Sequence, residues 1–275
     1  KINKDDNQAW NNRGNTLGNL ERYEEAVASF DQALKINKDD NQAWNNRGNA
    51  LMALGRHEEA VASFDQVLKI KPDNDWAWNN RGIALCDLKR YEEAVASFDK
   101  AIEFRSDNHE AWHNRGVALK NLGRYEEAVA SFDQALEIKP DYDSAWNIRG
   151  VALKDLERYE EAVASFDQAL KIKPDNDSAW YNRGIALHKL GRYEEALVSF
   201  DQAIKFKPDK HEALVNKGNV LVKLKRDTEA IEFYNRALNC IDPQWWEAWN
   251  QNQGLANIST PNPEKWKQLQ DYMMQ

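Results

Sequence analysis

The sequence has few of the residues that build disulfide frameworks, membrane spans and phosphate-binding loops. Its only two cysteines, Cys86 and Cys240, lie too far apart along 275 residues to indicate a disulfide framework or a paired metal motif. No apolar run approaches the roughly 18 residues that a membrane span needs. No charged-then-apolar leader is visible in the printed sequence. These absences favour a cytoplasmic protein that is not embedded in a membrane.

The chain also lacks an excess of basic charge. Its 37 Lys and Arg residues are outnumbered by 45 Asp and Glu residues, which gives a formal charge of −8. Proteins that bind nucleic acid by neutralising phosphates need positive charge, so nucleic acid is not an expected partner. The 42% hydrophobic and 30% charged residues are a balance typical of a globular chain.

Tryptophan, by contrast, is frequent and regularly spaced. Six of the 11 tryptophans recur every 34 residues, and seven glycines from Gly14 to Gly218 keep the same interval. The six are Trp10, Trp44, Trp78, Trp112, Trp146 and Trp180. A fixed period of this length indicates a repeat array. We count seven units over residues 7–244 and number the 34 places of each unit from its first residue.

Each unit predicts two short helices. Apolar and small residues recur at steps of three and four from Trp10 to Leu20, and again from Tyr23 to Leu34. Links such as Gly55-Arg56 are helix stops, and Asp and Pro residues separate the units. Each unit is therefore predicted to be a helical hairpin.

The two ends of the chain differ from the regular array. Residues 1–10 are identical to residues 35–44, so we expect residues 1–6 to be the end of a truncated upstream unit. Residues 245–275 predict a degenerate eighth first helix followed by a capping helix, in which Trp266, Leu269 and Met273 form one apolar stripe.

Residues 7–244 resemble the tetratricopeptide repeat (TPR) family. The resemblance rests on Trp at place 4, Gly at place 8, Ala at places 20 and 27, Phe at place 24 and Pro at place 32. It implies an all-α fold, a right-handed superhelical solenoid of antiparallel helix pairs, here with C-terminal capping helices. The chain departs from the family at place 7, where Leu is usual and Arg stands in the first six units.

Two rows of large side chains have structural interpretations. The place-4 tryptophans lie on the apolar side of their helices, so we expect them to pack in the core. The place-7 arginines accompany aspartates at place 25, and the seventh unit changes both at once to Lys217 and Asn235. We predict an ion pair within each unit, such as Arg81 with Asp99.

No catalytic, metal or cofactor site is expected. His109-Glu110-Ala111-Trp112-His113 matches the zinc-protease string H-E-x-x-H, but its Glu-Ala piece belongs to the repeat pattern and no third ligand follows nearby. The glycines come singly rather than in a phosphate-binding loop, and no nucleophile and base gather outside the repeat pattern.

The candidate binding residues are polar side chains on the first helix of each unit. In TPR arrays place 6 faces a concave groove, and a row of amides there can pair with the backbone of an extended peptide. That row is Asn12, Asn46, Asn80, Asn114, Asn182 and Asn216, interrupted by Ile148. A second row at place 5 contributes Asn11, Asn45, Asn79, His113 and Tyr181, and Trp76 breaks the consensus nearby.

These residues predict a non-enzymatic module that binds a protein or peptide in its groove. Two alternatives remain open at this stage. The array is an assembly scaffold that associates end to end, or it is the substrate-recruiting arm of a larger multidomain enzyme or signalling protein.

Overall fold

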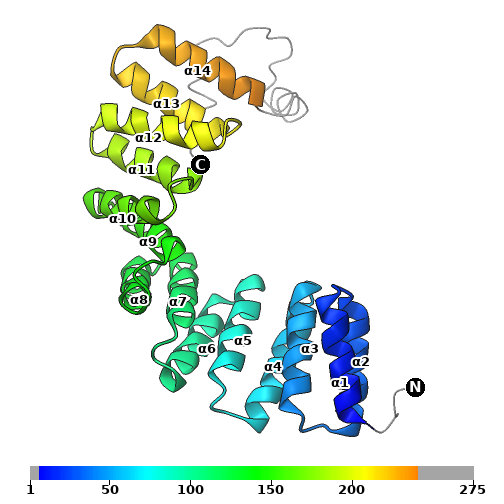
Figure 1. Ribbon diagram of the computed structural model, residues 1–275. Coiled ribbons are helices and arrows are strands. Elements are labelled where there is room, and N and C mark those ends of the chain that lie inside the picture. Colours follow the sequence, from blue (N-terminus) through cyan, green and yellow to red (C-terminus); the bar gives the residue numbers. More distant parts are fainter. Residues whose placement is uncertain (1–5, 241–275) are drawn as a thin grey trace, which may run out of the picture. The chain divides into compact units, whose positions relative to one another are not determined.

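The computed structural model describes residues 6–240, and this part of the chain consists of helices joined by short turns (Figure 1). The expected capping segment, 245–275, lies outside the described residues. First and second helices alternate along the chain. The first helices are α1 (Asn7–Asn19), α3 (Asn41–Ala53), α5 (Asp75–Asp87), α7 (His109–Asn121), α9 (Asp143–Asp155), α11 (Asp177–Lys189) and α13 (His211–Lys223). The second helices are α2 (Tyr23–Ile36), α4 (His57–Ile70), α6 (Tyr91–Phe104), α8 (Tyr125–Ile138), α10 (Tyr159–Ile172), α12 (Tyr193–Phe206) and α14 (Asp227–Cys240).

Local sequence determines where the helices begin. Asp40 caps α3 by accepting hydrogen bonds from the backbone N–H groups of Gln42 and Ala43, both at 3.0 Å. Second helices lack such a cap, but most carry two glutamates in their first turn, where negative charge suits the helix dipole. In α4 the second of these, Glu59, also accepts two hydrogen bonds of 2.7 Å from Arg56.

The chain divides into two compact parts, residues 1–156 and 157–275. In the first part, every second helix packs against the first helix of its own hairpin and that of the next hairpin. The first helices α1 and α3, α5 and α7, and α7 and α9 also contact each other directly. The first helices therefore line one face, called the inner face below, and the second helices form the outer face. The second part repeats this packing, with α11 in contact with α13.

The core of each hairpin depends on a phenylalanine at place 24 and a glycine at place 8. Phe64 and Phe98 are fully buried. A Cβ atom added to Gly48 would lie 2.6 Å from Cε1 of Phe64, so only glycine lets the two helices approach this closely. Between hairpins, Ala33, Leu34 and Ala43 form a buried cluster. The predicted all-α architecture of antiparallel helix pairs is confirmed.

The place-4 tryptophans are only partly buried, which corrects the expectation that they are core residues. Trp44 packs against two successive buried clusters, Ala33–Leu34–Ala43 and Val67–Leu68–Ala77. Its indole N–H donates a 2.8 Å hydrogen bond to the carbonyl oxygen of Lys38 in the turn between hairpins. The tryptophan therefore joins neighbouring hairpins while part of its ring stays accessible from the outer face.

The turn between the two helices of a hairpin needs a left-handed residue, and the sequence does not always supply glycine. Gly123 has φ +74° in its turn, whereas Lys89 adopts φ +60° at the equivalent position. A side chain disfavours this conformation by roughly 1 kcal/mol.

We expect Lys89→Gly to raise the free energy of unfolding by about 1 kcal/mol and Gly123→Ala to lower it by a similar amount. Urea unfolding followed by circular dichroism measures both, and a loss of stability in Lys89→Gly would contradict the argument.

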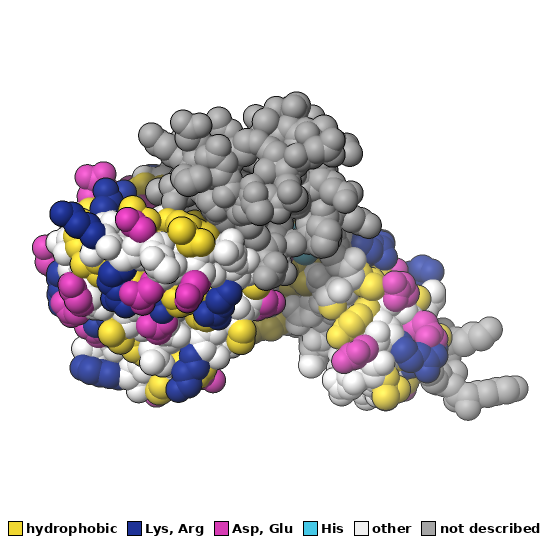
Figure 2. Space-filling view, turned by 90° about the horizontal axis from the view of Figure 1, so that it is seen from above, with side chains coloured by type: hydrophobic (Ala, Val, Ile, Leu, Met, Phe, Trp, Pro, Cys, Tyr) yellow, Lys and Arg dark blue, Asp and Glu magenta, His cyan; other side chains and the backbone are white. Residues whose placement is uncertain are grey.

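The surface in view in Figure 2 carries basic and acidic side chains interspersed, without a broad patch of one sign. Within residues 6–240, no helix is both long and apolar enough to cross a bilayer.

Candidate functional site

A groove on the inner face lies between α1 and α3 and is lined mainly by amides. Asn15, Asn19, Gln42, Asn46 and Asn49 line it together with Tyr23, and its volume is about 340 Å³. The two glycines of α1 also line it; Gly14 is buried, whereas Gly18 is partly exposed. This surface can offer hydrogen-bond donors and acceptors to an extended chain without requiring charge.

Several place-6 asparagines link neighbouring first helices. The Asn46 amide nitrogen donates to Oδ1 of Asn15 at 2.9 Å and to Oδ1 of Asn11 at 3.3 Å. Asn80 donates to Asn49 at 3.3 Å. These side chains lie at the predicted place on the inner face, but part of their hydrogen-bonding capacity holds the helices together.

Asn114 makes the same kind of link, because it donates to Asn79 of the preceding first helix at 3.2 Å. The exposed Asn12 instead accepts from Gln8 of its own helix at 3.0 Å. In the second part of the chain, Asn182 donates to the Ser178 carbonyl at 3.0 Å.

Asn216 is the last of this row. It donates at 3.0 Å to the Glu212 carbonyl oxygen and at 3.1 Å to the hydroxyl of Tyr181. Burial is the main cause that raises the pKa of Tyr181 to about 12, so this hydroxyl stays neutral.

The place-5 row is mostly buried, which corrects part of the sequence-based prediction. Asn11, Asn79 and His113 are 1%, 4% and 8% exposed, so they cannot contact a peptide that lies in the groove. Asn45 and Tyr181 are half-buried. These residues lie on first helices that contact each other directly, such as α1 with α3 and α5 with α7.

Three groove residues are added by the structure, Asn19, Gln42 and Tyr23. Gln42 occupies place 2, and Trp76 is the place-2 residue of the next unit, where it is 39% exposed. The repeat therefore puts Trp76 at the position equivalent to a groove-lining residue. Trp76 was predicted because it departs from the repeat consensus. Gln42 occupies the same place in its own unit, so extending the prediction to place 2 of the other units would have included it.

His113 packs among aromatic rings rather than in a metal site. Its ring centroid lies 4.9 Å from that of Tyr142 and 5.6 Å from that of Phe132, while His109 also contacts Tyr142. Burial, with a smaller contribution from the charge of His109, lowers the pKa of His113 to about 4. Residues 6–240 contain no group of three or more His, Cys, Asp or Glu side chains placed to hold a metal ion.

This burial predicts a pH-dependent stability. Because the folded pKa of His113, about 4, lies below the ordinary value of 6.5, protonation favours the unfolded chain. The contribution of neutral His113 to the free energy of unfolding is fully present above pH 6.5 and is lost as the pH falls toward 4. The total loss is roughly 3 kcal/mol. We expect His113→Asn, which copies Asn79 of the preceding unit, to unfold with a weaker dependence on pH. Urea titrations at pH 7.5 and 4.5 measure this, and an unchanged pH dependence would contradict it.

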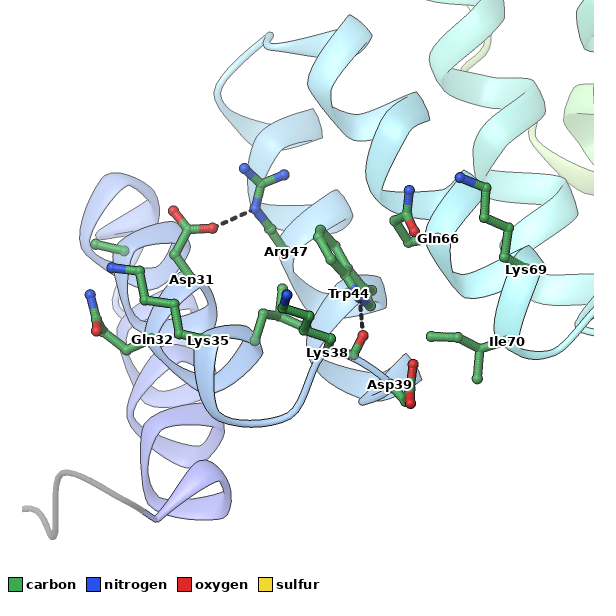
Figure 3. A pocket seen from close by; sticks show the side chains of 12 residues that line it. Asp31, Gln32, Lys35, Lys38, Asp39, Trp44, Arg47, Gln66, Lys69 and Ile70 are labelled. Atoms are coloured by element: carbon green, nitrogen blue, oxygen red, sulfur yellow. Dashed lines mark hydrogen bonds and ion pairs between the residues drawn. The ribbon is translucent and has the colours of Figure 1, made fainter.

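A second, larger pocket opens on the outer face at the first junction between units (Figure 3). It has a volume of about 1000 Å³ and lies between α2, the start of α3 and the end of α4. The Trp44 indole stands in its middle, with Arg47 above it and Lys38 beside it (Figure 3). The pocket at the second junction is smaller, about 370 Å³, and is lined by the equivalent residues Trp78 and Arg81.

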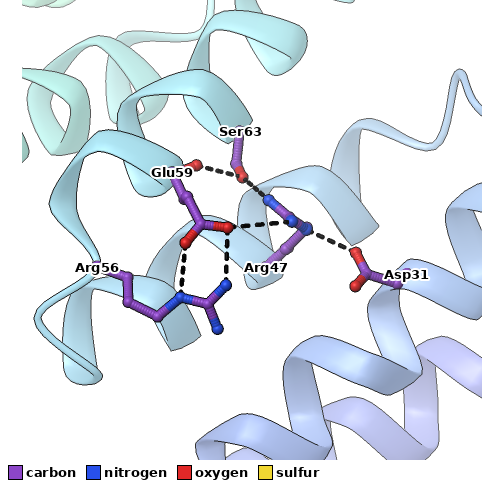
Figure 4. Close-up of polar contacts among 5 residues, drawn as sticks. All are labelled: Asp31, Arg47, Arg56, Glu59 and Ser63. Carbon is purple, nitrogen blue, oxygen red and sulfur yellow. Dashed lines mark hydrogen bonds and ion pairs between the residues drawn. The ribbon is translucent and has the colours of Figure 1, made fainter.

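From the second unit to the sixth, the place-7 arginines form ion pairs, but with the preceding unit. Arg47 Nε lies 2.7 Å from Oδ1 of Asp31, and Arg47 also donates to Ser63 Oγ at 2.7 Å (Figure 4). Arg81 pairs with Asp65 at 2.6 Å, and Asp99 pairs with Arg115 at 2.6 Å. The prediction of a pair between Arg81 and Asp99 is therefore wrong in its partner, although the ion pair itself exists.

The seventh unit obeys the same rule. Lys217 pairs with Asp201 of the preceding unit, and both lie in the second part of the chain. The simultaneous change to Lys217 and Asn235 is thus not an exchange within one pair.

Comparisons with known proteins agree with this architecture. Models of the tetratricopeptide repeat match residues 11–75, 63–96, 109–142, 178–210 and 211–239. A model described as TPR repeat matches residues 84–123 and 150–191. No curated protein sequence matches the chain.

Solved structures share the fold. YrrB, described as a TPR protein with an unusual peptide-binding site, is 26% identical, with a TM-score of 0.59 over 67% of this chain and 95% of YrrB. PilW, a type IV pilus biogenesis factor, is 24% identical, with a TM-score of 0.66 over 75% of this chain and 96% of PilW. MamA from Desulfovibrio magneticus is 21% identical, with a TM-score of 0.58 over 60% of this chain and 94% of MamA. Matched by repeat models from residue 11 to residue 239 with one short gap, the chain belongs to the tetratricopeptide-repeat family and is a protein-interaction module.

Proposed function

We propose that this chain is a non-enzymatic module that binds an extended peptide segment of a protein partner along the inner face of its first helices. The observation that carries the proposal is the amide-lined groove between α1 and α3. An extended peptide exposes backbone N–H and C=O groups, and amide side chains can pair with both kinds.

Two residues make this groove suited to a ligand rather than only to helix packing. Asn19 and Gln42 line the groove, and among residues 6–240 neither side-chain amide has a hydrogen-bond partner in the protein. Both are exposed. Their hydrogen-bonding capacity is thus available, whereas that of Asn46 is partly used between helices.

The similarity to YrrB supports the same proposal. That protein is described as having a peptide-binding site, and its structure aligns with two thirds of this chain. The similarity supports peptide binding by this chain.

Selection from a displayed random peptide library tests the proposal. A selected peptide, labelled with a fluorophore, is titrated with the chain and with the double variant Asn19→Ala, Gln42→Ala. Loss of two hydrogen bonds is expected to weaken binding roughly tenfold. The matched control is Gln134→Ala, which removes an exposed amide from the second helix α8 and leaves affinity unchanged.

Two outcomes contradict the proposal. One is equal affinity of the parent chain and the groove variant, which would place the contact elsewhere. The other is a selection that returns no binding peptide, which would favour the assembly scaffold or the recruiting arm of a larger protein.

A further inference from the structure

We infer that the outer pocket at the first junction is a second binding site, for an acidic peptide segment that carries one bulky apolar side chain. This site lies on the outer face, between α2, the start of α3 and the end of α4, and is separate from the inner groove. Three features of the pocket support it: its apolar centre, its unpaired lysines and its difference from the equivalent third junction.

The apolar centre can accept a side chain. Trp44 is partly buried, and its indole N–H is already bonded to Lys38, so the ring is held in place. Ile70, which is 38% exposed, lies on the α4 side, and Leu34 lies at the base. A Phe or Leu side chain inserted here would cover apolar surface that water now contacts.

The charges around this centre favour an anionic partner. Lys35, Lys38 and Lys69 line the pocket, and within residues 6–240 none of them forms an ion pair. Two carboxylates also line the pocket. Asp31 is paired with Arg47, and Asp39 offsets one of the three lysines, so the balance of charge stays positive. Exposed charges act over about 10 Å at 0.1 M salt, a range that covers the residues flanking an inserted side chain.

The third junction is a natural control for this charge. It keeps the tryptophan, the arginine and its aspartate as Trp112, Arg115 and Asp99. At the places of the three lysines it instead has Glu103, Ser106 and Glu137. The third junction therefore has the same repeat scaffold without the three lysines, and two glutamates stand in their places. Lys100, at the place of Gln32, is paired with Glu103 at 2.6 Å. The third junction is thus expected not to bind the acidic segment.

The test uses a fluorescein-labelled pentapeptide of four glutamates around a central phenylalanine. Anisotropy titration is expected to show binding to the parent chain that weakens roughly tenfold or more in Lys35→Glu, Lys38→Ser, Lys69→Glu, because three favourable charge contacts are lost. These three side chains are exposed, so the variant should keep its helicity by circular dichroism. Replacing the phenylalanine of the peptide by alanine should also weaken binding.

The reverse exchange provides a gain of function. Glu103→Lys, Ser106→Lys, Glu137→Lys is expected to create an additional site, so that calorimetry gives one more bound peptide per chain than for the parent chain. The groove variant Asn19→Ala, Gln42→Ala should bind the pentapeptide like the parent chain, which separates this site from the proposed peptide groove.

Three results would overturn the inference. They are no binding to the parent chain, equal binding to the lysine variant, and equal binding of the alanine peptide, which would indicate charge attraction without insertion into the pocket.

Discussion

Exchanging the charges of Arg81 and Asp65 together is expected to restore much of the stability that either reversal removes. Arg81 Nε lies 2.6 Å from Asp65, and the arginine side chain is only 19% exposed. Arg81→Asp alone places two carboxylates against each other at a partly desolvated junction and should lower the free energy of unfolding by roughly 2 kcal/mol. A double-mutant cycle should give a coupling energy of about 1 kcal/mol or more. Recovery is incomplete because Arg81 also donates to Ser97.

The control exchanges Arg81 with Asp99, the acid of its own unit. These residues face different junctions, since Asp99 pairs with Arg115. Arg81→Asp with Asp99→Arg should therefore damage two junctions and restore nothing. Coupling in this cycle, together with none between Arg81 and Asp65, would contradict the observed pairing.

Gly14→Ala is expected to destabilise the first hairpin, whereas Gly18→Ala, one turn later in the same helix, is not. A Cβ atom at position 14 would lie 2.5 Å from the buried ring of Phe30, so the helices must separate. Overpacking of this kind lowers stability by about 1–3 kcal/mol. At position 18 a Cβ atom meets nothing within 4 Å, so alanine should be neutral or stabilise the helix by up to about 1 kcal/mol.

Hydrogen exchange of the α1 and α2 amides measures these two effects locally. This readout is preferable to global melting, because each hairpin of a repeat array contacts only its neighbours and can open by itself. Equal effects of the two alanines would contradict the role of Gly14 in helix packing.

The helices and their pairing could be predicted from the sequence because the 34-residue period repeats the same amphipathic pattern in every unit. The partner of Arg81 could not be predicted in this way. In a periodic chain the place-25 aspartate lies 18 residues after the arginine of its own unit and 16 before that of the next, and both spacings recur in every unit. The direction in which successive hairpins stack decides whether Arg81 faces Asp65 or Asp99, and it brings Arg81 to Asp65.

The residues of the inner groove could be predicted only in part, because helical spacing does not show which side chains are buried between neighbouring helices. Helical spacing assigns Asn11 and Asn12 to the first helix but does not show that the former is buried between helices while the latter is exposed. The same limit applies to Trp44, because an apolar stripe does not reveal whether a ring is enclosed or borders an outer pocket. Lys35, Lys38 and Lys69 are far apart or unremarkable in the sequence, and they indicate a common pocket only once the helices that carry them have been placed.

The most direct test of peptide binding at the inner face is photo-crosslinking of a selected peptide, with the attachment sites mapped by mass spectrometry. Crosslinks to α1 and α3 are expected, concentrated near Asn19, Gln42 and Asn49. Crosslinks confined to α4 and to the part of α2 beyond Tyr23 would contradict peptide binding at the inner face.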